Sequence, residues 1–255
     1  MLTVKREIAV HVNELPCLPD DAPAELRSSA ACPLIVDPEQ RAALEHFGVL
    51  RARLLNARNK SGVRSVLVSS PQRQDGKSFT ALNLAISLAQ LQQMRVLLVD
   101  GDLRLKGITR NLGLEQRTGL ADFLQDWSGF EDCVKSTTLP HLYVAPAGNV
   151  SGEMLPAILE GARWPNFIEK AKQEFDLVIV DSVPVSAPIA DFELLLNACD
   201  TALLVVHVRK TTRAAMNHTA DRMQGKLLGV VVNNKEQQRN LDYHLPYGNH
   251  TTSKY

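Results

Sequence analysis

One stretch of this sequence indicates the type of fold most directly: Val66-Leu67-Val68-Ser69-Ser70-Pro71-Gln72-Arg73-Gln74-Asp75-Gly76-Lys77-Ser78. Its first half is an apolar run typical of a buried strand, and a helical pattern follows at 79–91. A strand, a loop and a helix in this order can hold a phosphate, because the first N–H groups of a helix lack partners and carry its positive dipole end. Gly76 allows a tight turn, Lys77 supplies an ammonium for phosphate oxygens, and Ser78 supplies a hydroxyl for Mg²⁺.

Carboxylates at two other strand ends strengthen this prediction. The loop alone is a moderate signal, because Pro71 stands where the common phosphate-loop pattern has glycine. The apolar run 96–99 ends in Asp100 and Asp102, and the run 177–180 ends in Asp181. Clustered carboxylates repel one another unless a cation neutralises them. The sequence therefore predicts a site for a nucleotide and Mg²⁺.

The order of the apolar runs predicts the fold class. We expect an α/β fold of the P-loop NTPase type: a doubly wound, mostly parallel sheet with helices on both faces. The expected strands are 64–69, 95–100, 141–145, 177–181, 201–207 and 227–232, and the expected helices are 77–91, 152–160, 164–173, 187–198 and 211–223. Ligands of such sheets bind beyond the carboxyl ends of the strands, where the loop and the carboxylates lie.

The chain is expected to form one domain with two extensions. Residues 1–36 contain four prolines with weak periodicity and predict an irregular leader. Residues 37–235 form the predicted P-loop domain, and a helix is expected from Asp37-Pro38 onward. Residues 236–255 are polar and predict a flexible tail that contains tyrosines.

Composition narrows the possible partners and compartment. Lys plus Arg and Asp plus Glu both number 28, so overall charge does not favour a nucleic-acid partner. No apolar run reaches the ~18–20 residues that span a bilayer. The four cysteines are scattered, without metal-binding spacing. We expect a cytoplasmic protein that binds no nucleic acid and has no membrane segment of its own.

Two further motifs carry a family resemblance. Asp100-Gly101-Asp102-Leu103-Arg104 follows one apolar run, and Asp181-Ser182-Val183-Pro184 follows another. With the loop at Lys77, they resemble the bacterial tyrosine kinases (BY-kinases) of capsule and exopolysaccharide export, a branch of the MinD/ParA-like P-loop NTPases, in their free-standing cytoplasmic form. The resemblance covers about residues 40–235, judged by these motifs and their helical and strand context.

The resemblance implies an activity and roles for residues. It implies an ATP-dependent, non-specific protein-tyrosine kinase that phosphorylates itself and regulates exopolysaccharide or capsule polymerisation and export. Lys77 would contact the phosphates, while Ser78, Asp102 and Asp181 would organise Mg²⁺. Asp100 would orient the attacking tyrosine hydroxyl and accept its proton, or help to hold the metal. The expected catalytic residues are thus Lys77, Asp100, Asp102 and Asp181, and the expected nucleotide-binding residues are Gln74, Asp75, Gly76, Lys77, Ser78, Phe79 and Arg104.

The family also implies acceptors and partners. Its members phosphorylate C-terminal tyrosines between subunits of a ring, and here Tyr243, Tyr247 and Tyr255 lie in the last 13 residues. A membrane-spanning chain-length regulator is the implied activator, which would recruit the chain to the inner face of the membrane. The family's subunit-contact motif, E-x-x-R-x-x-R, is matched at Glu45 and Arg51 but has Gly48 at its centre. Gly48 removes a guanidinium that would pair with a neighbour's carboxylate in the homo-oligomeric ring that the family implies.

Two other functions fit parts of the sequence. The first is a MinD/ParA-like positioning ATPase, but Gln72 stands where that class has a lysine that reaches across a dimer. The second is a non-catalytic, nucleotide-dependent regulator of a polysaccharide-export complex. Gly48 and the sparse tyrosines of the tail are compatible with this second function.

Overall fold

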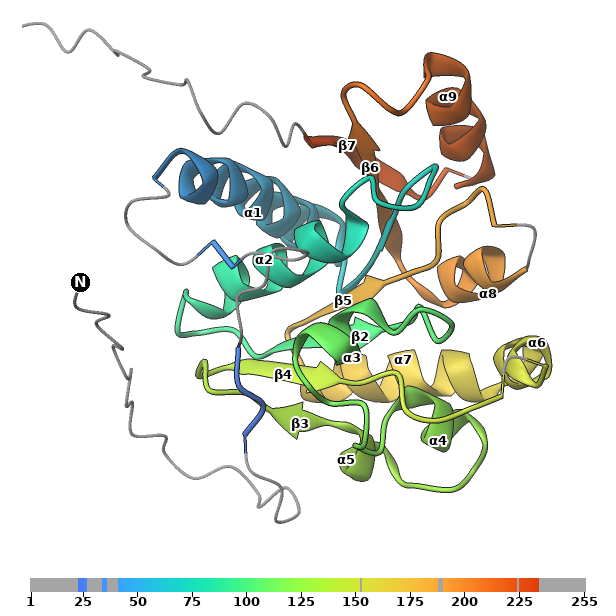
Figure 1. Ribbon diagram of the computed structural model, residues 1–255. Helices are drawn as coiled ribbons and strands as arrows, with labels where there is room; N and C mark the ends of the chain where they lie inside the picture. Colours follow the sequence, from blue (N-terminus) through green and yellow to red (C-terminus); the bar gives the residue numbers. More distant parts are fainter. Residues whose placement is uncertain are drawn as a thin grey trace, which may run out of the picture.

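The fold is a seven-stranded sheet with helices on both faces (Figure 1). The computed structural model describes residues 23–26, 34–35, 41–151, 153–187, 190–223 and 225–233. The strands are β1 (Ser65–Ser69), β2 (Val96–Asp100), β3 (Lys135–Ser136), β4 (Leu142–Ala145), β5 (Leu177–Asp181), β6 (Thr201–His207) and β7 (Leu227–Asn233). Their order in the sheet is β3-β4-β2-β5-β1-β6-β7, and every pair is parallel except β3 with β4.

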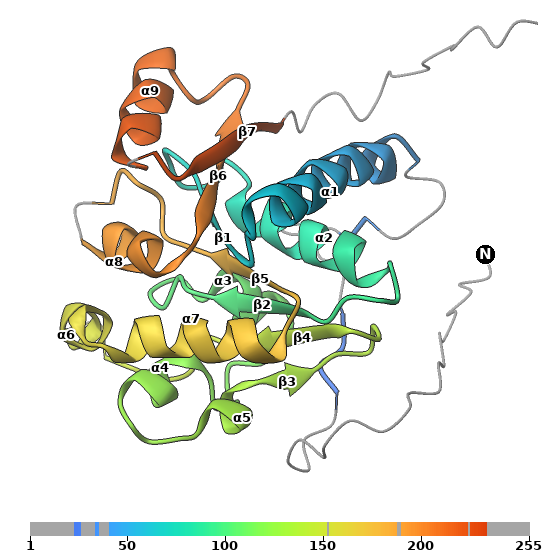
Figure 2. The ribbon, with the colours of Figure 1, turned by 180° about the vertical axis from the view of Figure 1, so that it is seen from behind.

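Helices bury both faces of this sheet and create two cores (Figures 1 and 2). The helices are α1 (Arg41–Ser61), α2 (Lys77–Ala89), α3 (Gly107–Asn111), α4 (Leu120–Leu124), α5 (Phe130–Cys133), α6 (Leu155–Glu160), α7 (Arg163–Glu174), α8 (Asp191–Ala198) and α9 (Arg213–Arg222). Leu54, Leu82 and Ile108 from α1, α2 and α3 fill one core. Trp164, Phe167 and Phe192 from α7 and α8 are buried in the other. The predicted doubly wound α/β class is confirmed.

The predicted strands agree with the structure to within a residue or so. The exception is β3, which sequence analysis did not predict because two residues cannot show an alternating apolar pattern. Helix α8 begins at Asp191, later than the expected 187, because residues 185–187 form a turn. Residues 188–189 lie outside the described part of the chain.

The strand order determines where the site lies. Strands β2, β5 and β1 are neighbours, so the loop after β1 lies beside the ends of the other two. Asp100 and Asp181 are register partners at the ends of β2 and β5. The central strands are buried along their whole length, which keeps these ends in fixed positions.

Parts of the leader pack on the core. Ala24 forms a parallel bridge to Thr137 beside β3, and its N–H donates to the Ser136 carbonyl over 2.8 Å. The Ile35 N–H donates to Asn83 Oδ1 of α2 over 2.7 Å. The predicted helix start at 37–40 and the predicted tail at 236–255 lie outside the described residues.

None of the helices that the structure describes has both the length and the apolar character needed to cross a membrane.

Candidate functional site

The loop between β1 and α2 is shaped by two left-handed residues and one contact from β7. Gln74 has φ 67° and Gly76 has φ 102°, and residues other than glycine rarely adopt backbone conformations with positive φ. A Cβ built on Gly76 would lie 2.1 Å from Asn233 Nδ2. That same amide nitrogen donates to the Asp75 carbonyl over 3.0 Å. The loop therefore enters α2 in a conformation that requires glycine at position 76 and is held by the hydrogen bond from Asn233.

Lys77 and Ser78, the first two residues of α2, point into a group of buried carboxylates. Lys77 Nζ lies 3.1 Å from Asp102 Oδ2 and 3.6 Å from Asp181 Oδ1. It also donates to Ser78 Oγ over 3.2 Å. The Ser78 hydroxyl in turn donates to Asp181 Oδ2 over 2.6 Å. The ammonium, the hydroxyl and both carboxylates thus form one continuous network at the carboxyl ends of β2 and β5.

Asp100 is fully buried beside this network and is held by α3. Its Oδ2 accepts from the Thr109 N–H over 2.8 Å and from the Thr109 hydroxyl over 2.7 Å. Its Oδ1 is buried and has no hydrogen-bond partner among the described residues. The structure therefore brings Lys77, Ser78, Asp100, Asp102 and Asp181 into one cluster.

Burial and mutual repulsion govern the charges in this cluster. Burial and the nearby Asp181 raise the pKa of Asp100 to about 7, against the hydrogen bonds from Thr109. Burial also raises the pKa of Asp181 to about 6, although Lys77 and Ser78 oppose the shift. Burial acts to lower the pKa of Lys77, but the charges of Asp181 and Asp102 outweigh it and raise that pKa. Three carboxylates thus share a single ammonium, which leaves room for further positive charge.

The cluster fits Mg²⁺ bound together with phosphate. Asp181 Oδ1 is a buried oxygen without a hydrogen-bond partner in the described part of the chain, and a cation would satisfy it. No group of three or more His, Cys, Asp or Glu side chains among the described residues is arranged to hold a metal on its own. Mg²⁺ usually takes only one or two carboxylates and completes its shell with water and substrate phosphates. Ser78, Asp102 and Asp181 are the residues that would hold it here.

Two residues predicted to bind nucleotide have their side chains engaged elsewhere. The Arg104 guanidinium bonds both oxygens of Asp191 at the start of α8, at 2.8 and 3.3 Å. The Phe79 ring packs edge-on against Phe47 of α1, with 5.8 Å between ring centroids. Of the remaining loop residues, Gln74 is exposed, whereas Asp75 is buried and its Oδ2 accepts from the Gln72 N–H over 3.0 Å.

Sequence analysis did not single out Asn233 or Thr109 as site residues. Asn233 ends β7, an edge strand that the sheet order places two strands from β1. Its position at a strand end was visible in the sequence, but its contact with Gly76 was not. Thr109 lies nine residues beyond Asp100, and only the fold of α3 returns it to that carboxylate.

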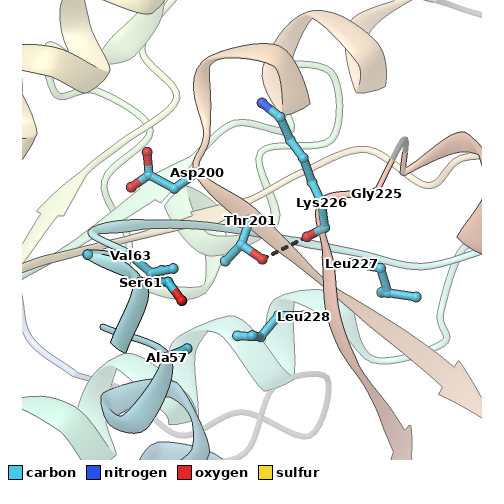
Figure 3. Close-up of a pocket in the computed structure, with 10 residues that line it drawn as sticks. Ala57, Ser61, Val63, Asp200, Thr201, Gly225, Lys226, Leu227 and Leu228 are labelled. Carbon is cyan, nitrogen blue, oxygen red and sulfur yellow. Dashed lines mark hydrogen bonds between the residues drawn. The ribbon is translucent and has the colours of Figure 1, made fainter. Parts of the chain in front are cut away.

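The cavity drawn in Figure 3 is a separate feature. It measures about 480 Å³ and lies between the end of α1 and the starts of β6 and β7, at the amino edge of the sheet. Its charged side chains are already engaged: Asp200 accepts from the N–H groups of Arg64 and Ser65, and Lys226 Nζ donates to three carbonyls at the end of α8. Both charged side chains of the cavity lining are thus held by hydrogen bonds to the backbone of neighbouring segments.

Comparison with known proteins places this geometry in a family. A family model described as an AAA domain matches residues 72–225. The tyrosine-protein kinase YwqD of Bacillus subtilis is 32% identical over 203 residues, which cover 78% of this chain and 84% of that protein. This chain belongs to the bacterial tyrosine-kinase family. Another relative, the succinoglycan biosynthesis transport protein ExoP of Rhizobium meliloti, is 30% identical over 67% of this chain and 22% of its own length.

Solved structures agree with membership of the bacterial tyrosine-kinase family. The BceF tyrosine kinase domain has a TM-score of 0.70 and 27% identity, covering 80% of this chain and 84% of its own. The septum site-determining protein MinD of Pyrococcus horikoshii, solved with Mg-ADP, has a TM-score of 0.57 and 22% identity over 69% and 72% of the two chains. The positioning-ATPase alternative is thus the more distant one, and MinD supports the fold alone.

Proposed function

We propose that this bacterial tyrosine-kinase homologue transfers the γ-phosphoryl group of ATP to tyrosine side chains. The observation that carries the proposal is the network of Lys77, Ser78, Asp102 and Asp181 directly after a phosphate loop. Relatives named as tyrosine-protein kinases support this reaction over simple ATP hydrolysis. Phosphoryl transfer depends on alignment and charge neutralisation more than on covalent chemistry, and this cluster offers both.

The residues take the following roles in the proposed reaction. The tyrosine oxygen attacks the γ-phosphorus, the bond from that phosphorus to the β,γ-bridging oxygen breaks, and ADP leaves with that oxygen. The tyrosine proton passes to Asp100. Lys77 leaves Asp102 and Asp181 and neutralises phosphate oxygens, and this movement uncovers the carboxylates. Mg²⁺, when bound, supplies charge neutralisation of the phosphates beside Ser78.

The proposed acceptors are Tyr243, Tyr247 and Tyr255, which lie outside the described residues. The fourth tyrosine, Tyr143, is 6% exposed on β4 and packs against Phe175, with the Arg95 guanidinium over its ring. A buried ring held in this way cannot enter another active site without unfolding its strand. The burial of Tyr143 leaves Tyr243, Tyr247 and Tyr255 as the proposed acceptors.

The cellular role we propose is control of exopolysaccharide or capsule polymerisation and export. The likeness to a succinoglycan transport protein supports it. We propose that the activator is a membrane-spanning chain-length regulator, which would recruit this chain to the inner face of the membrane. A homo-oligomer would serve phosphorylation between subunits. Within the chain, Arg51 Nη1 donates to the Ser87 carbonyl over 2.7 Å, so this end of the family's subunit-contact motif already makes one contact inside the subunit.

Incubation of the purified protein with Mg-ATP, followed by mass spectrometric mapping of phosphate, tests the proposal. We expect phosphate on Tyr243, Tyr247 or Tyr255 in the wild type and its loss in Lys77→Met and Asp100→Asn. ADP release without phosphotyrosine would support a positioning ATPase instead. Nucleotide binding with neither product would support the non-catalytic regulator.

A further inference from the structure

We propose that Thr109 is a positioning residue that fixes the orientation of the Asp100 carboxylate for phosphoryl transfer. This inference rests on the proposed kinase function. Thr109 lies in α3 and is 1% exposed. Its N–H and its hydroxyl both donate to Asp100, the last residue of β2. None of its atoms needs to touch the substrate, because its effect passes through Asp100.

The hydrogen bonds around Thr109 direct its hydroxyl proton toward the Asp100 carboxylate. The Ala147 N–H donates to Thr109 Oγ1 over 2.8 Å, and a backbone N–H can only donate. The hydroxyl proton of Thr109 is therefore available for Asp100 Oδ2, 2.7 Å away. The Thr109 N–H donates to the same oxygen. One oxygen of Asp100 is thus bound by two donors, and the other, Oδ1, is left for the substrate hydroxyl.

The segment that holds Thr109 is fixed at two points, and α3 is fixed at a third. The Ala147 carbonyl accepts from the Ala121 N–H of α4 over 2.9 Å. The next residue, Gly148, accepts from Lys106 Nζ over 2.7 Å. Leu112, at the end of α3, is buried in the core beside α2. The orientation of Asp100 therefore depends on a chain of contacts that links the ends of β2 and β4.

A fixed orientation matters because a carboxylate can rotate about its Cβ–Cγ bond. Without the threonine hydroxyl, Asp100 Oδ2 keeps only the backbone donor, and the carboxylate can turn away from the attacking hydroxyl. Misorientation lowers the rate of the chemical step but leaves the phosphate contacts of ATP intact. We therefore expect a change in kcat with little change in the KM for ATP.

Thr109→Val tests this inference, because it removes the hydroxyl at nearly constant volume. We expect kcat for phosphotyrosine formation to fall about ten- to a hundred-fold, with the KM for ATP within about twofold of wild type. Thr109→Ser should restore kcat to within about threefold, since serine supplies the same donor. Thr219→Val is the matched control: Thr219 is a buried threonine of α9 whose hydroxyl donates to the Ala215 carbonyl, and we expect no change in kcat.

A crystal structure of Thr109→Val provides a readout that does not depend on activity. We expect the Asp100 carboxylate to be rotated relative to wild type. An unrotated carboxylate, an unchanged kcat in Thr109→Val, or an equal loss in the valine and serine variants would overturn the inference. If the wild type itself forms no phosphotyrosine, the proposed function fails, while the crystal structures still decide whether Thr109 holds Asp100.

Discussion

At the residue scale, the site contains more negative charge than its single ammonium can balance. Asp100 is buried beside Asp181, and burial raises its pKa to about 7. A raised pKa in the folded state means that folding disfavours the ionised form. The stability that the neutral carboxyl provides is fully present below the unfolded pKa near 3.8 and is lost as pH rises through about 7.

The first prediction follows for Asp100→Asn, which cannot ionise. We expect it to raise the melting temperature of the nucleotide-free protein at about pH 8 by roughly 3 to 8 °C, and by clearly less at about pH 5. Differential scanning calorimetry at both pH values measures the effect. Asp221→Asn, on the exposed surface of α9, is the control and should change neither value. A gain that does not depend on pH would contradict this account of Asp100.

The second prediction concerns Lys77, whose ammonium pairs with both Asp102 and Asp181. Removing one partner of a buried ion pair leaves uncompensated charge. We expect Lys77→Met to lower the free energy of unfolding in chelator by about 2 to 4 kcal/mol. Millimolar Mg²⁺ without nucleotide should restore more stability in the variant than in wild type, as urea titrations would show. Equal responses to Mg²⁺ would argue against competition between Lys77 and the cation.

Sequence spacing predicted where the site backbone lies better than where its side chains point. Lys77, Asp100 and Asp181 follow apolar runs, and parallel strands bring their carboxyl ends to one edge. The sequence could not show that Arg104 would turn to Asp191, because a long side chain chooses its partner from the tertiary structure. The same holds for Thr109, whose contact with Asp100 depends on the path of α3.

At the element scale, the loop before α2 is held in place by an edge strand of the sheet, β7. Asn233 of β7 closes against Gly76, so the nucleotide loop depends on a strand that is distant in sequence. The sequence predicted both elements, whereas β3 and its bridge to Ala24 were not predictable. That short pairing is imposed by neighbouring strands and carries no pattern of its own.

The third prediction compares a glycine of the loop before α2 with a glycine inside α1. Gly76→Ala must hold φ 102° and meets Asn233 Nδ2, so we expect a loss of about 2 kcal/mol or more in stability and a Kd for ADP raised over about tenfold. Gly48→Ala in α1 meets nothing within 4 Å and should gain about 0.5 to 1 kcal/mol without changing the Kd. Chemical denaturation and calorimetric titration with ADP distinguish the two. Equal effects at both positions would contradict the role given to Gly76.

At the scale of the whole molecule, the two edges of the sheet differ in chemistry. The carboxyl edge holds the buried carboxylates with their ammonium, and the amino edge holds the cavity of Figure 3, whose charged side chains are hydrogen-bonded to backbone groups. The fold class and the place of the carboxylates at the carboxyl edge followed from the order of the apolar runs, whereas the cavity at the amino edge was not predicted. The docking of Ala24 and Ile35 on the core did not, because the leader has no periodicity to reveal it.

A crystal structure of the protein with Mg²⁺ and a non-hydrolysable ATP analogue tests the central claim most directly. We expect the phosphates to lie over the N-terminus of α2, with the Lys77 ammonium moved from Asp102 to phosphate oxygens and the metal about 2.1 Å from Ser78 Oγ. An analogue bound at the amino-edge cavity, or Lys77 still paired with Asp102 beside bound phosphates, would contradict it.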